Sequence, residues 1–158
     1  QTYFVAENVT ERYSTYILSV NGEPGELTEG PDGILYKENA QNRGRDYERK
    51  VHLELISSDG ETVFTQYGGI RAHGGDSRKH AIKPFKIYAR KEYQNGKGSF
   101  NFDGFGTLTL DGSAVVEKYD KMILRDGGDD YQQSGLREVF RSLCACYLRM
   151  GYNAHRGI

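Results

Sequence analysis

A short run of glycine and polar residues near the middle of the chain could bind an anion. Gly74, Gly75, Ser77 and Arg78 lie within five positions, here called the glycine loop (residues 74–78), and Lys83 follows. Glycines let a backbone approach an anion closely, and consecutive amide hydrogens can converge on it. A serine hydroxyl can donate a hydrogen bond to phosphate, and an arginine can contact two phosphate oxygens at once. These residue types in this order indicate a phosphate-binding loop.

The same residues can also be interpreted without a ligand. A glycine pair before a polar turn often does no more than join two strands. Lys83 could be an edge-strand lysine that discourages aggregation. Lys86 is three positions after Lys83, so on a strand the two side chains point to opposite faces. We expect Lys86 to point toward solvent. Both interpretations stay open on the residues alone.

The charge distribution is uneven in this region. Residues 71–91 contain seven lysines and arginines and one acid, although the net charge of the whole chain is −1. A basic block that begins with glycines is typical of anion sites, but a solvated pair of basic strands would have the same composition. The chain as a whole is not basic, which argues against nucleic-acid binding.

Other reactive residue types form no site that the sequence can assign. The four histidines lack zinc-ligand spacing, and no nucleophile elbow or catalytic Cys–His signature occurs. Asp126, Asp129 and Asp130 lack the spacing of a calcium loop, so we expect them to cap and turn the chain or to pair with Arg125. The sequence therefore predicts no metal site.

The length and the hydropathy pattern predict a domain rich in β-structure. The 158 residues suit one domain or part of a larger one, and no apolar run is long enough to cross a membrane. Alternating apolar side chains and intervening turn residues predict an antiparallel arrangement of short strands. The predicted strand regions are residues 13–20, 51–56, 62–69, 69–73, 83–90 and 119–125.

One amphipathic helix is predicted after these strands. Apolar side chains recur at helical spacing from Leu136 to Leu148. Cys144 and Cys146 lie two positions apart on this helix, so they face different sides and should not pair with each other. The expected fold class is therefore α+β, with an antiparallel β-sheet of about five strands and one main packed helix.

Three stretches, taken in order, resemble the CotH family of atypical kinases, the family of spore coat protein H. The most specific stretch has the family's pattern of a glycine–glycine–any–serine–arginine loop, a spacer and a lysine-led strand. Pro84 stands where the family usually has serine, and Glu138 stands where it usually has aspartate. The three stretches are residues 42–49, residues 69–90 and residues 122–138, within a resemblance that covers roughly residues 32–150.

The resemblance implies an atypical kinase, with the fold of the N-terminal part of a protein-kinase-like domain. Such a protein binds ATP with Mg²⁺ and transfers phosphate to serine or threonine of a protein substrate. The glycine loop and Lys83 would then contact the nucleotide, and Glu138 would orient Lys83 from the first turn of the helix. An acid favoured there by the helix dipole is the alternative role of Glu138.

The turn and strand pattern predicts an N-terminal entry segment with short strands over residues 1–45. The resemblance implies that residues 46–158 are the nucleotide-side region, and it also implies a location. The catalytic and metal-binding aspartates are expected beyond Ile158, so this fragment alone is expected to be inactive. The family is commonly exported or associated with the bacterial spore coat.

A second function class remains open on the sequence. The chain could be a non-catalytic, β-rich module of a secreted bacterial surface protein that recognises carbohydrate or protein. Twelve tyrosines and many polar turns fit this alternative, because aromatic rings stack on sugars and anchor interfaces.

Overall fold

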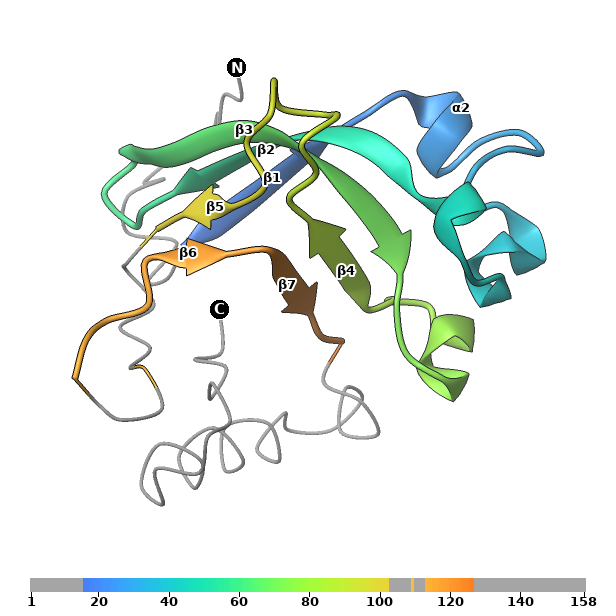
Figure 1. The fold of residues 1–158 in the computed structure, drawn as a ribbon. Helices are drawn as coiled ribbons and strands as arrows, with labels where there is room; N and C mark the ends of the chain where they lie inside the picture. Colours follow the sequence, from blue (N-terminus) through green and yellow to red (C-terminus); the bar gives the residue numbers. More distant parts are fainter. Residues whose placement is uncertain (1–15, 103–108, 110–112, 127–158) are drawn as a thin grey trace.

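The protein is described by a computed structural model, which covers residues 16–102, 109 and 113–126. These residues form an antiparallel sheet of five strands in the order β1-β2-β3-β4-β7, and a separate two-stranded sheet of β5 and β6 (Figure 1). The fold is therefore mostly antiparallel β-sheet with few helices, as the strand pattern predicted. The helix predicted around residues 136–148, with Glu138 and both cysteines, lies outside the described residues.

Within the residues that the structure describes, the strands are short except for the central pair, and every helix has five residues or fewer. The large sheet contains β1 (Ile17–Asn21), β2 (Arg49–Ile56), β3 (Thr62–Ala72), β4 (Phe85–Tyr88) and β7 (Lys121–Leu124), and the small sheet contains β5 (Phe100–Asn101) and β6 (Lys118–Tyr119). The helices are α2 (Pro24–Leu27) and the 3₁₀-helices η1 (Lys37–Gln41), η2 (Arg45–Tyr47) and η3 (Asp76–Lys79).

The hairpin of β2 and β3 forms the centre of the large sheet. Val51, Leu53 and Leu55 are buried, as their alternation predicted. The turn between the strands contains Gly60 at φ +90°, a value that favours glycine. β1 pairs with the other side of β2, so residues on both sides of the predicted boundary at position 45 share one sheet.

The strand β3 is longer than expected, because the two predicted segments 62–69 and 69–73 form one continuous strand. Residues 62–70 pair with β2 and residues 69–72 pair with β4, so Gly69 and Ile70 lie between both neighbouring strands. Gly68 lies inside the strand where space is short, since a Cβ there would lie 3.0 Å from Leu53 Cδ1 and 3.0 Å from Tyr88 O.

The strand β4 is shorter than expected and begins only at Phe85. Pro84 lacks an amide hydrogen and precedes the strand, in agreement with the predicted position near its start. The carbonyl of Pro84 still accepts a hydrogen bond of 2.8 Å from the His73 amide. Lys83 therefore lies in the connection before β4, and the prediction that it belongs to a strand over residues 83–90 is wrong.

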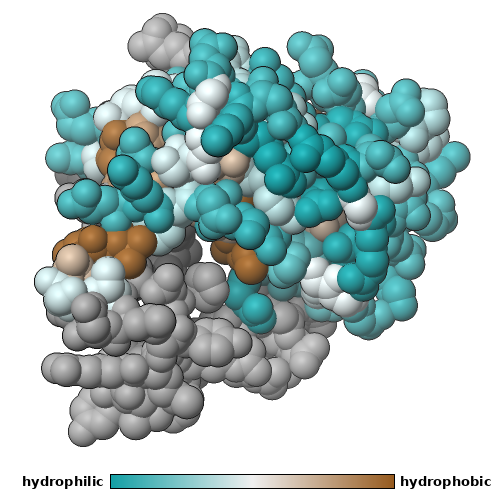
Figure 2. Space-filling model, in the orientation of Figure 1, coloured by the Kyte–Doolittle hydropathy of each residue, from teal (hydrophilic) through white to brown (hydrophobic). Residues whose placement is uncertain are grey.

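The two faces of the large sheet differ in character. One face packs on a core of six fully buried side chains, which are Ile34, Val51, Leu53, Ile70, Ile87 and Phe100. The alternation of side chains places Tyr67 and Arg71 of β3 and Lys86 and Tyr88 of β4 on the other face, here called the polar face. The molecular surface seen in Figure 2 is mostly hydrophilic over the described residues, with a few small hydrophobic patches.

Within the part of the chain that the structure describes, no helix combines the length and the apolar composition needed to cross a membrane.

Candidate basic and phosphate-binding site

The glycine loop leaves the end of β3 and turns into η3. Gly74 has φ +97°, and a Cβ at this position would collide with Ser77 Oγ. Only glycine combines that backbone conformation with so close an approach. Gly75 is exposed, and a Cβ there would meet no atom within 4 Å. The loop thus places Gly74 and Ser77 in contact and leaves Gly75 open to solvent.

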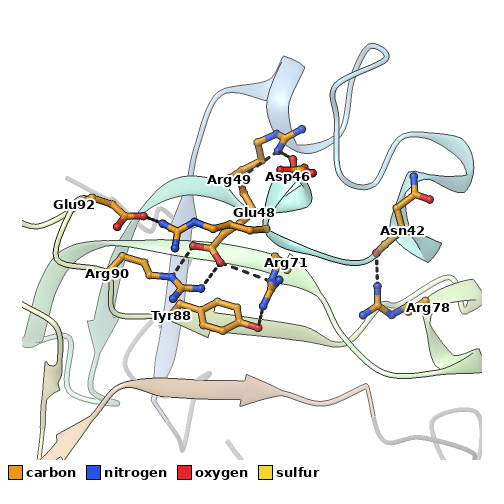
Figure 3. A network of polar contacts seen from close by, with 10 residues as sticks. Asn42, Asp46, Glu48, Arg49, Arg71, Arg78, Tyr88, Arg90 and Glu92 are labelled. Atoms are coloured by element: carbon orange, nitrogen blue, oxygen red, sulfur yellow. Dashed lines mark hydrogen bonds and ion pairs between the residues drawn. The ribbon is translucent and has the colours of Figure 1, made fainter.

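Arg78 holds the loop against η1. Its side chain is buried, and its Nε donates a hydrogen bond of 2.7 Å to Gly74 O. Its Nη1 donates to Asn42 O at 2.6 Å and to Ala40 O at 3.2 Å (Figure 3). Burial, followed by the positive charges of Arg43 and Arg71, lowers the pKa of Arg78. Arg78 therefore has a structural role that the sequence did not predict, and its contact with phosphate stays a prediction.

Lys83 lies close to the backbone of its own connection. Its Nζ donates a hydrogen bond of 2.8 Å to His80 O, and its side chain is half-buried. The imidazole of His80 is in turn 2.7 Å from Asp126 Oδ2. Lys83 thus uses one of its three ammonium hydrogens on a backbone carbonyl in the connection between η3 and β4.

Two basic residues lie on the polar face next to this loop, and two more follow the ends of β3 and β7. We call Arg71, His73, Lys86 and Arg125 the basic cluster. Arg71 on β3 and Lys86 on β4 are direct cross-strand partners. Burial lowers the pKa of the His73 imidazole, and the charges of Lys86, Arg78, Arg125 and Arg71 lower it further. These four cations are therefore close enough to His73 to affect its charge.

A buried carboxylate organises the neighbouring part of the polar face (Figure 3). The side chain of Glu48 is 0% exposed. It accepts two hydrogen bonds from Arg90, from Nε at 2.9 Å and from Nη2 at 2.8 Å. Arg71 Nε lies 3.6 Å from the same carboxylate. The hydrogen bonds from Arg90 to Glu48 raise the pKa of Arg90, which favours the positively charged guanidinium.

Tyr88 joins the two arginines. The guanidinium carbons of Arg71 and Arg90 lie 4.4 Å and 4.5 Å from the centre of the Tyr88 ring. Arg71 Nη2 also donates a hydrogen bond to the Tyr88 hydroxyl. We call Glu48, Arg71, Tyr88 and Arg90 the Glu48 network. Cation–π contacts and a shared carboxylate fix the orientation of both arginines.

The Glu48 network was not predicted from the sequence. Arg71 and Arg90 counted only as members of a basic block, and Glu48 stood in a run of mixed charges. Glu48 precedes β2, whereas its partners lie on β3 and just after β4, so only the strand pairing brings them together. A buried acid at the start of a strand gives no local signal in one sequence.

The glycine loop contains four of the predicted positions, and Lys83 lies five residues further along, in the connection before β4. Glu138 lies outside the described residues. Among residues 16–102, 109 and 113–126, no group of three His, Cys, Asp or Glu side chains could hold a metal ion. Comparisons of the chain with protein-family models, with curated proteins and with solved structures found no match.

Proposed function

We propose that this chain binds the phosphates of a nucleotide, as the nucleotide-side part of an atypical kinase similar to the CotH family. The ligand would be ATP with Mg²⁺. The acceptor would be serine or threonine of a protein, in an exported or spore-coat setting, as the resemblance implies.

The observation that carries this proposal is the position of the basic cluster beside the glycine loop. The loop follows β3 directly, and the cations come from β3, β4 and the residue after β7. Phosphoryl-transfer proteins act mainly by positioning the phosphates and by balancing their charge. A glycine with positive φ next to several cations supplies both a close backbone approach and positive potential.

The residues present fit a triphosphate better than they fit a free metal ion. Four cations act on His73, whereas the described part of the chain offers no group of three metal-ligating side chains. Mg²⁺ usually keeps several waters and binds through substrate phosphates with one or two carboxylates. Mg²⁺ would therefore arrive with the nucleotide and shield its phosphate charges.

The alternative of a glycan-binding module has less support from the aromatic side chains. Tyr67 is the one aromatic among the large apolar side chains that the described residues expose, at 44%. Its ring is already in contact with Lys50 Nζ at 4.4 Å and with the His52 ring at 5.0 Å between centroids. Sugar stacking needs an open aromatic face, and the Lys50 and His52 side chains already contact this ring.

The proposal is tested by thermal unfolding of the chain with MgATP, with magnesium alone and with a panel of soluble glycans. A ligand at 100 times its dissociation constant adds about 2.7 kcal/mol to stability, which shifts the midpoint by a few degrees in a domain of this size. We expect such a shift with MgATP and none with magnesium alone. A shift with a glycan and none with MgATP would favour the binding-module alternative.

A further inference from the structure

We propose that the phosphate chain of the nucleotide binds on the polar face of the sheet, between Arg71 of β3 and Lys86 of β4, with His73 and Arg125 at its sides. This inference rests on the proposed function and specifies its site. It assigns the phosphate contacts to residues of the basic cluster in place of Arg78 and Lys83.

The first argument is the register of β3 and β4. Arg71 and Lys86 are direct partners in this antiparallel pair, and Gly69 and Tyr88 are the next pair on the same face. Side chains at such positions start about 5 Å apart, and like charges directly opposite each other are destabilising. An anion between the two cations removes that repulsion. The register thus forms a site that a negatively charged group would stabilise.

The second argument is the lack of a carboxylate partner for Lys86. No carboxylate of the described residues forms an ion pair with its ammonium, and its side chain is half-buried. The nearest aromatic contact is loose, with Nζ 5.6 Å from the centre of the Tyr88 ring. A half-buried lysine that no acid neutralises keeps a positive charge that an anionic ligand can balance.

The third argument is the way that Arg71 is held. Its Nε faces Glu48 at 3.6 Å and its Nη2 donates to the Tyr88 hydroxyl. Glu48 already accepts two shorter hydrogen bonds from Arg90. Nη1 of Arg71 donates to no residue that the structure describes, and the side chain keeps 22% of its surface exposed. The contacts of Arg71 therefore fix the orientation of its guanidinium before a ligand binds and leave Nη1 as a donor for that ligand.

The fourth argument comes from the two residues that the sequence favoured. Two nitrogens of Arg78 donate to three backbone carbonyls, and the side chain is only 8% exposed. Lys83 donates to His80 O within its own connection. Arg78 stabilises the shape of the glycine loop, and Lys83 stabilises the connection that follows it. In the proposed phosphate site the glycine loop contributes its backbone, and the basic cluster contributes the positive charge.

The ring of His73 also has free hydrogen-bonding capacity. Its amide donates to Pro84 O, which continues the pairing of β3 with the chain before β4. Its ring makes no hydrogen bond to any residue in the described ranges, and it is half-buried beside Arg71, Arg78, Lys86 and Arg125. An anion bound to these cations would accept a hydrogen bond from the ring.

The test measures binding of MgATP, of magnesium tripolyphosphate and of adenosine to the whole 158-residue chain by calorimetry. The variants are Lys86→Ala, Lys83→Ala and Lys97→Ala, the last being an exposed lysine in the connection after β4. Loss of a charged hydrogen bond weakens binding by about tenfold or more. We expect that loss in Lys86→Ala for both phosphate ligands, with changes below about threefold in the other two variants. Circular dichroism confirms that each variant is folded.

Arg71→Lys provides a second test that keeps the charge and the fold. Lysine cannot reach the phosphate and the Tyr88 hydroxyl with one planar group, so we expect weaker binding of both phosphate ligands at unchanged secondary structure. Normal binding by both Lys86→Ala and Arg71→Lys would overturn the assigned site.

The outcomes separate the site from the function. If MgATP binds and only Lys83→Ala weakens it, the proposed function stands and the assignment to the basic cluster is wrong. If tripolyphosphate binds through Lys86 while MgATP does not, the anion site stands and the nucleotide function is wrong. If neither ligand binds the unmodified chain, both are wrong.

Discussion

Two groups of cations lie side by side on the polar face of the sheet, and Arg71 belongs to both. In the Glu48 network, two arginines share one fully buried carboxylate and the ring of Tyr88. In the basic cluster, Lys86 and His73 have no carboxylate partner among the residues that the structure describes. The first group satisfies its charges within the protein, whereas Lys86 and His73 in the second group are not neutralised by any carboxylate of the described residues. This difference is the physical basis for dividing the face into a structural part and a binding part.

The largest effect is expected when the structural part loses its carboxylate. Glu48→Gln keeps the shape of the side chain but leaves Arg71 and Arg90 without their common counter-charge. Removal of one partner from a buried ion pair costs about 3 to 5 kcal/mol, and the lower end applies here because the arginines remain 22% and 27% exposed. Urea unfolding measures this loss.

A matched control for Glu48→Gln is Glu92→Gln. Glu92 pairs with Arg45 at the surface, where the two side chains are 49% and 57% exposed. Exposed pairs contribute about 0 to 1 kcal/mol, so the control variant should be close to the unmodified chain. Equal losses in the two variants would contradict the structural role assigned to Glu48.

The next largest effect is expected at Arg78, which separates loop structure from phosphate binding. Arg78→Ala removes the donors to Gly74 O, Ala40 O and Asn42 O. The buried carbonyl of Ala40 and the two part-buried carbonyls then lose a charged donor, and we expect a loss of about 2 to 3 kcal/mol in the free energy of unfolding. Lys79→Ala, at an exposed neighbour that pairs with Asp76, should change stability by less than about 1 kcal/mol. Denaturant unfolding of both variants measures the difference, and a stable Arg78→Ala chain would contradict this role.

Gly69→Ala tests how closely the Glu48 carboxylate packs on the sheet. A Cβ at Gly69 would collide with Glu48 Oε1 and lie 2.8 Å from Tyr93 Cε2. The carboxylate would have to move from its arginines, and such overpacking costs about 1 to 3 kcal/mol. Gly25→Ala is the control, because a Cβ there would meet no atom within 4 Å. Thermal unfolding of the two variants should differ, and an unchanged Gly69→Ala midpoint would show that the carboxylate has room.

The sheet could be predicted from the sequence because its signals are local. The alternation of Val51, Leu53 and Leu55 and the turn that contains Gly60 determine the central hairpin. The ring of Pro84 likewise delays the start of β4. The glycine pair within β3 misled the prediction, because glycines often end strands but here make room for Leu53 and Glu48.

The site could be predicted only in part, because its charges meet through pairing between strands. The composition indicated a basic region, but not that Arg71 would lie opposite Lys86 or that Glu48 would neutralise Arg90. Arg78 has the residue type of a phosphate ligand, yet the backbone carbonyls around η1 decide its contacts. Such partners are far apart in the chain, and one sequence contains no information that links them.

The smallest effect is the most specific to the binding part, and it concerns the pH dependence that His73 confers. The folded pKa of His73 is below its ordinary value of 6.5, through burial and then through the nearby cations. Between these two values the unfolded chain binds more protons than the folded chain, so stability increases with pH and the full contribution is present above about pH 6.5. His73→Asn should therefore reduce the loss of stability between pH 7.5 and the folded pKa.

Bound tripolyphosphate should offset the cations and raise the pKa of the His73 ring, as measured by proton NMR. A pKa at or above 6.5 in the free chain would contradict the burial of His73 and its position near these cations, on which the comparison depends.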